Sequence, residues 1–184
     1  VKQGLKVLKL KKNLGLKTLM DVCNVDSNLS IYHLGYVLGP RINAGGRVGK
    51  SSHGANLLLN SNSKDVFKIA IELNEYNKER QLLEKDLLEK VLKEGRANVK
   101  DPVLILKGTN WHEGVIGIVA ARLKERFNKP TIIISINGNI GKASARSIVG
   151  FDIGSAIIAA TQDKLLLKGG GHKMAGGFSI DISN

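Results

Sequence analysis

Residues 103–135, VLILKGTNWHEGVIGIVAARLKERFNKPTIIIS, contain the pattern that decides the fold. The apolar run Val103–Leu106 predicts a strand, and the periodic apolar stretch over about Val115–Phe127 predicts a helix. A second apolar run over Thr131–Ser135 predicts another strand. Strand, helix and strand in this order are typical of a β-α-β unit. The sequence therefore predicts an α/β fold.

The predicted sheet continues toward the C-terminus. Asn137-Gly138-Asn139 predicts a tight turn into a strand over about Ile140–Ala145. Asp152 is placed to cap a further helix, and Gly177–Ile182 predicts the last strand. We expect a mixed sheet flanked by helices.

A long helix is predicted before the sheet. From about residue 63 to residue 98 no proline intervenes, and apolar residues recur at steps of three, four or seven: Val66, Ile69, Leu73, Tyr76, Leu83, Leu87 and Val91. At about 1.5 Å per residue this helix would run roughly 50 Å, enough to bridge two lobes. A coiled-coil dimer is the alternative, although charged Arg80 interrupts the stripe. Short helices are expected over residues 1 to about 38.

The composition favours a polyanionic partner. The chain has 28 Lys and Arg against 16 Asp and Glu, a formal net charge of +12. Six lysines and no acid occur in the first seventeen residues, which form either a solvated face or a nucleic-acid contact. The single cysteine, Cys23, excludes an intramolecular disulfide and fits a reducing cytoplasm. No segment is long and apolar enough to predict a membrane span.

Residues 39–49, GPRINAGGRVG, contain four glycines, two arginines, an asparagine and a proline. We expect no regular helix or strand here and interpret the segment as a loop that binds phosphate through backbone N–H groups and arginines. The candidate ligands are Arg41, Asn43 and Arg47. A sharp turn with solvated arginines is the alternative. A nucleotide-binding P-loop is rejected, because Ala44 stands where that motif needs its first glycine and no buried strand precedes it.

Two segments place polar side chains beside the predicted strands. Trp111-His112-Glu113-Gly114 lies between the carboxyl end of a strand and the amino end of a helix, where open α/β sheets bind ligands, although partly buried packing is the alternative. Ser144 and Arg146 lie two residues apart on a predicted strand, so both should point to one face. We expect them to hold one phosphate together.

A second glycine-rich segment, Gly169–Gly177, has five glycines around His172 and Lys173. It stands directly before the last predicted strand. A flexible linker is the alternative interpretation.

These four segments together resemble the RecJ single-strand-specific exonucleases of the DHH phosphoesterase superfamily. GPRINAGGR, WHEGVIGIVA, SARS and GGGHKMAGGF match that family in order and spacing. The resemblance implies three regions. Residues 1–60 are the C-terminal part of a DHH catalytic domain, residues 61–99 are the connecting helix, and residues 100–184 are a DHHA1 substrate-binding domain.

The resemblance also implies an activity: metal-dependent 5′ to 3′ hydrolysis of single-stranded DNA, in DNA repair and recombination, with Mn or Mg as cofactor. The chain has no Asp-His-His triplet and its four histidines are far apart, so no catalytic residue or metal ligand is assigned and the chain alone is predicted to be inactive. By resemblance, Ser144 and Arg146 belong to the 5′-phosphate pocket, Arg47 joins them, and His172 lies on the wall facing the metals. The other candidate substrate-binding residues are Arg41, Asn43, His112, Gly170 and Gly171.

Two other functions stay open. A phosphodiesterase of short oligonucleotides or cyclic dinucleotides would use a similar glycine-histidine segment, although the Gly-Pro-Arg segment disfavours it. A non-catalytic nucleic-acid-binding module, like the related domain appended to alanyl-tRNA synthetase, would need only the basic charge. Single-stranded DNA is the predicted partner.

Overall fold

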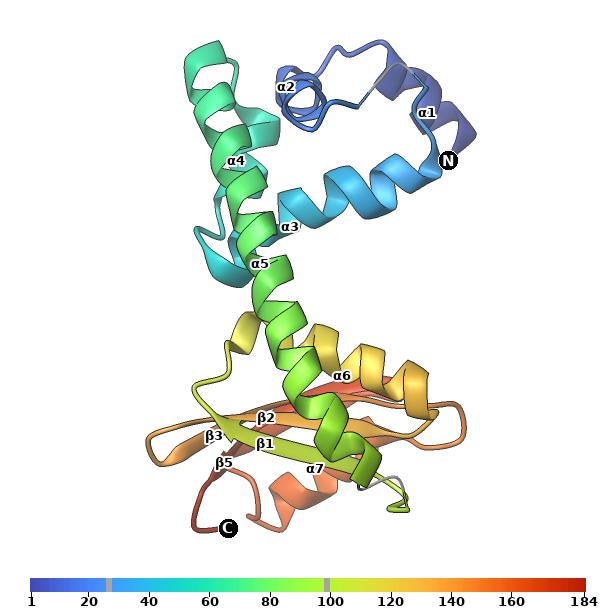
Figure 1. Ribbon diagram of the computed structural model, residues 1–184, viewed down its shortest axis with the longest axis vertical. Coiled ribbons are helices and arrows are strands. Elements are labelled where there is room, and N and C mark those ends of the chain that lie inside the picture. Colours follow the sequence, from blue (N-terminus) through green and yellow to red (C-terminus); the bar gives the residue numbers. More distant parts are fainter. Residues whose placement is uncertain (26–27, 98–99) are drawn as a thin grey trace. The chain divides into compact units, whose positions relative to one another are not determined.

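The computed structural model describes residues 1–25, 28–97 and 100–184. The chain folds into two compact units, Val1–Leu82 (unit 1) and Leu83–Asn184 (unit 2). The division falls within the longest helix, α5 (Ser63–Ala97), which has 35 residues (Figure 1). The long helix predicted from residue 63 is therefore confirmed, and its expected end at residue 98 lies outside the described residues.

Unit 1 is helical, as the sequence predicts for its first part. Its elements before α5 are α1 (Lys2–Lys9), α2 (Leu14–Val22), the π-helix η1 (His33–Leu38), α3 (Gly39–Val48) and α4 (His53–Leu59). Leu19, Met20, Leu38 and Leu57 are buried together with Val66 and Leu73 of α5. The first half of the apolar stripe on α5 thus completes the core of this unit.

Residues 39–49 form a helix and not the expected loop. Pro40 lies in the first turn of α3, where its missing N–H and fixed φ are tolerated. Gly45 is required by packing, because an added Cβ would lie 2.5 Å from the carbonyl oxygen of Lys50. None of the glycines in this segment has a positive φ. Since the helix uses these backbone N–H groups internally, the predicted backbone cradle for phosphate is wrong.

Unit 2 contains a five-stranded mixed sheet with the strand order β1-β2-β3-β5-β4. The strands are β1 (Leu104–Thr109), β2 (Thr131–Asn137), β3 (Ile140–Arg146), β4 (Lys168–His172) and β5 (Ala175–Asp181). β1 and β2 are parallel and are joined through helix α6 (Glu113–Phe127), so the predicted β-α-β unit is confirmed. All the other strand pairs are antiparallel.

Two helices cover opposite faces of this sheet (Figure 1). α6 packs over β2 and β3, and α7 (Ile153–Gln162) packs against β4 and β5 on the other face. Asp152 caps α7 as predicted, because its Oδ1 accepts a hydrogen bond of 3.0 Å from the Ser155 N–H. Each face of the sheet is therefore covered over only part of its width.

The core of unit 2 lies between α5, α6 and the sheet. Leu87 and Val91 of α5 are buried with Val119 and Leu123 of α6 and Ile133 of β2. The second half of the α5 stripe is used here, so the stripe packs within the chain and does not form the coiled-coil alternative. Glu84 of α5 is 4% exposed and forms an ion pair with Arg122 of α6.

Gly169–Gly177 covers most of β4, the start of β5 and the turn between these paired strands, so the flexible-linker alternative is wrong. β4 was not predicted, because glycine runs weaken a strand in isolation. Here packing against α7 leaves no room for larger side chains. A Cβ at Gly176 would lie 2.5 Å from Ile157 of α7. On the α7 side, a Cβ at Gly154 would lie 2.9 Å from the His172 backbone. Close contact between α7 and the hairpin thus accounts for the composition of this segment.

Candidate nucleic-acid interface

Strand β3 presents Ser144 and Arg146 to the side of the sheet that carries α6. An added Cβ at Gly117 of α6 would lie 2.8 Å from Ser144 Oγ and 3.1 Å from an Arg146 Nη atom. Arg146 Nη1 donates hydrogen bonds to Ser144 Oγ (3.2 Å) and to the Ala145 carbonyl (2.8 Å). Both side chains are half-buried. The two predicted phosphate ligands therefore lie together on one face.

Strand pairing extends this face across β5 to β4. Ser144 pairs with Gly177, which in turn pairs with Gly170, and Arg146 pairs with Ala175, which pairs with His172. Paired residues point to the same side of a sheet, and neighbouring strands lie about 4.8 Å apart. His172 therefore lies about 10 Å from Arg146 on the same face. We call this surface the open face; its residues are Ser144, Arg146, Gly170, His172, Ala175 and Gly177.

Gly170 lies on the open face, two strands away from Ser144. A Cβ added at Gly170 would meet no atom within 4 Å, which shows that space is open above this part of β4. Gly171 alternates to the other face of the sheet with Gly176, beside α7. Of the two glycines predicted as binding residues, only Gly170 therefore belongs to the open face.

The two predicted histidines have local structural contacts. His112 is the N-cap of α6, and its Nδ1 accepts a hydrogen bond of 3.1 Å from the Gly114 N–H. His172 ends β4, and its Nδ1 accepts a hydrogen bond of 3.3 Å from the Met174 N–H. Both side chains are exposed. His112 is thus fixed at the amino end of α6, while His172 lies on the open face.

Sequence reasoning missed one charged pair beside the open face. Lys142 of β3 lies on the same side as Ser144 and Arg146, and its Nζ is 2.8 Å from Glu113 Oε2 at the start of α6. The alternation of Lys142, Ser144 and Arg146 along β3 was the available signal.

The remaining candidates belong to unit 1. Arg41 donates hydrogen bonds to Asn74 Oδ1 of α5 (2.9 Å) and to the Val37 carbonyl (2.8 Å), so it connects three helical segments. Asn43 and Arg47 are exposed on α3, four residues apart and hence on one side of the helix. Their convergence with Ser144 and Arg146 of unit 2 stays a prediction.

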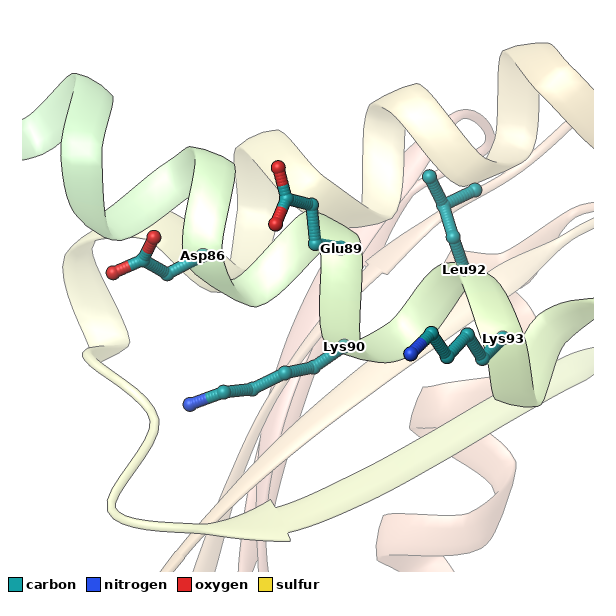
Figure 2. Close-up of a pocket in the computed structure, with 5 residues that line it drawn as sticks. All are labelled: Asp86, Glu89, Lys90, Leu92 and Lys93. Carbon is teal, nitrogen blue, oxygen red and sulfur yellow. The ribbon is translucent and has the colours of Figure 1, made fainter.

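A hollow of about 510 Å³ lies along α5 in unit 2, and none of the predicted binding residues is among its described lining residues. Its described lining residues are Asp86, Glu89, Lys90, Leu92 and Lys93, all from α5 (Figure 2). These described residues mix two carboxylates with two ammonium groups, so they give the hollow no electrostatic preference for a polyanion.

The described residues form neither a metal-binding cluster nor a membrane-spanning helix. Among residues 1–25, 28–97 and 100–184, no three His, Cys, Asp or Glu side chains gather closely enough to hold a metal ion. In the same residues, no helix has both the length and the apolar character needed to cross a membrane. The described residues therefore do not fit the divalent metals implied by the family resemblance.

Comparison with known proteins identifies the domain that carries the open face. The DHHA1 domain family matches residues 100–184. This part of the chain is similar to DHHA1 domains. The chain is 36% identical over 176 residues to the single-stranded-DNA-specific exonuclease RecJ of Escherichia coli, and 31% identical over 181 residues to that of Bacillus subtilis. These matches cover 91% and 96% of the chain, but only 30% and 23% of the two relatives.

Solved structures agree with the sequence matches. RecJ of Thermus thermophilus in complex with Mn²⁺ is 30% identical, with a TM-score of 0.86 over 99% of the chain and 26% of that structure. Another RecJ bound to manganese is 30% identical, with a TM-score of 0.84 over the whole chain and 45% of that structure. The resemblance to RecJ exonucleases and the mixed α/β fold are thus confirmed, for a chain that spans less than half of each of these relatives.

Proposed function

We propose that this chain is the substrate-binding part of a RecJ-like exonuclease that degrades single-stranded DNA from the 5′ end. The Ser144–Arg146 pair beside the glycine backbone of β4 and β5 is the observation that carries the proposal. In this arrangement residues 1–60 belong to a DHH catalytic domain, residues 61–99 connect the two parts, and residues 100–184 bind the substrate.

The chemistry of the pair suits a terminal phosphate. The planar guanidinium of Arg146 offers parallel N–H donors that match phosphate oxygens. Ser144 Oγ already accepts a hydrogen bond from Arg146, so its own proton is available to a third group. One phosphate can therefore be bound by both side chains, with Arg146 held in position before the ligand arrives.

The rest of the open face suits the strand that follows the phosphate. Gly170 and Gly177 carry no side chain, so the sugar-phosphate backbone can approach the sheet closely. His172 adds a polar ring at the far side of this face. Asn43 and Arg47 of α3 supply further contacts to the strand, whereas Arg41 supports them through its hydrogen bonds to α5 and Val37.

Hydrolysis itself is assigned to metals, for which the described residues offer no cluster of three ligands. Related RecJ structures hold Mn²⁺ or Mg²⁺, and such ions supply an activated water and stabilise charge on the reacting oxygens. The described residues have no ligand cluster, so no catalytic step is derived for them. This chain binds DNA in the proposal and does not cleave it.

Arg146→Ala tests the proposal directly. Losing a charge-assisted, bidentate contact should weaken binding of 5′-phosphorylated oligothymidylate by on the order of 2 kcal/mol, or roughly thirtyfold. Binding of the same DNA with a 5′-hydroxyl should change far less. Fluorescence anisotropy measures both affinities. Equal losses on the two ligands would mean that Arg146 binds the DNA backbone generally, as expected for a non-catalytic nucleic-acid module.

A further inference from the structure

Lys142 and Glu113 form an ion pair that extends the row of polar groups on β3. Glu113 and Gly117 are four residues apart on α6 and therefore share one side of that helix. Gly117 contacts Ser144 and Arg146, and Glu113 contacts Lys142, so α6 runs along this row. The row consists of Lys142, Ser144 and Arg146. The Glu113 carboxylate lies opposite Lys142.

We propose that Lys142 binds an internal phosphate of the DNA strand, and that Glu113 is the counter-ion which this phosphate displaces. The inference rests on the proposed function, since it takes the 5′ phosphate to lie at Ser144 and Arg146. Lys142 is four residues from Arg146, which is roughly 13 Å along a strand. Its phosphate is thus not the terminal one but one further along the DNA.

The exposure of the pair permits this exchange. The Lys142 side chain is 54% exposed and that of Glu113 is 44% exposed, so water screens their attraction and the pair is easily opened. Until DNA binds, Glu113 holds the flexible Lys142 side chain beside the row and neutralises its charge. Glu113 therefore lowers the affinity for a DNA strand whose phosphate has to displace it from Lys142.

Lys142→Met tests the assignment in the 184-residue chain. Affinity for 5′-phosphorylated octathymidylate should fall by about fivefold, whereas affinity for thymidine 5′-monophosphate should change by less than about twofold. The slope of log affinity against log salt concentration on the oligonucleotide should decrease by about 0.7, the value for one lost phosphate contact. Lys107→Met is the matched control, because Lys107 is exposed on the opposite face of the sheet beside Ile134. It should change neither affinity.

Glu113→Gln tests the counter-ion. This change should raise the affinity for the oligonucleotide by about threefold in the native background. In a Lys142→Met background the gain should disappear, because Glu113 is proposed to act through Lys142. A gain that persists there would overturn the counter-ion role. Melting curves of all variants show whether each has kept its fold.

The same titrations separate this inference from the proposed function. If Arg146→Ala weakens 5′-phosphorylated DNA selectively but Lys142→Met has the same effect as Lys107→Met, the inference alone is wrong. If Arg146→Ala leaves both ligands unaffected, the proposed function fails. A loss with Lys142→Met that is as large for the mononucleotide as for the oligonucleotide would also overturn the inference, because Lys142 would then bind the terminal phosphate.

Discussion

Gly117→Ala tests the contact between α6 and the open face. The added Cβ would lie 2.8 Å from Ser144 Oγ and 3.1 Å from an Arg146 Nη atom, too close for either group to stay in place. Both are ends of side chains that can rotate away. Alanine also favours a helix interior by about 1 kcal/mol over glycine. We therefore expect the free energy of unfolding to change by less than about 1 kcal/mol.

The same substitution should have a larger effect on binding. Displacing Ser144 and Arg146 removes charge-assisted hydrogen bonds to phosphate, at about 1.5–3 kcal/mol, or roughly ten- to hundredfold in affinity. Fluorescence anisotropy with 5′-phosphorylated oligothymidylate measures this loss. Gly4→Ala in α1 is the control, because its added Cβ meets no atom within 4 Å. A folded Gly117→Ala chain with native affinity would refute the reasoning.

Three further predictions concern stability and activity. Leu123→Ala removes a fully buried side chain between α5, α6 and the sheet, and should lower the free energy of unfolding in urea by about 2–5 kcal/mol; a loss below about 1 kcal/mol would contradict the packing. The hydrogen bond from the Ser155 N–H lowers the pKa of Asp152 below its ordinary value of 3.8. The charged cap therefore adds its full stability above the ordinary pKa, and this stability is lost as the pH falls through the lowered pKa. Asp152→Asn keeps the cap without titrating, so the difference in melting temperature from the native chain should shrink between about pH 5 and pH 2; a constant difference would count against the cap. Incubated with labelled single-stranded DNA and Mn²⁺, the chain should release no mononucleotides, and release at the rate of a complete nuclease would overturn the assignment of hydrolysis to residues outside it.

The sequence predicts the helices and strands correctly where apolar periodicity and local caps agree. β1, α6 and β2 follow from apolar runs of the right length, β3 follows from the tight turn before it, and Asp152 marks the start of α7 by its position alone. Asn128 in the left-handed conformation ends α6, two residues before Pro130. The side of the sheet shared by Ser144 and Arg146 followed from the two-residue period of a strand.

The secondary structure of the glycine-rich segments was predicted wrongly because contacts with distant parts of the chain stabilise it. In α3, an added Cβ at Gly45 would lie 3.4 Å from the Leu73 side chain of α5, a contact that no local pattern reveals. In β4 and β5, pairing and α7 together order residues that would be flexible alone. The pairing of Lys142 with Glu113, 29 residues apart, likewise depends on how α6 lies over β3.

The central claim is that the open face binds a terminal phosphate, and the most direct test is an amide NMR titration of the chain with thymidine 5′-monophosphate. We predict that the largest shifts cluster on Gly117, Ser144, Arg146 and Gly170, with the Arg146 Nε–H shifted as well. Thymidine without phosphate should leave these signals unchanged. Shifts confined to the lysines of α1, or the same shifts with thymidine alone, would contradict the claim.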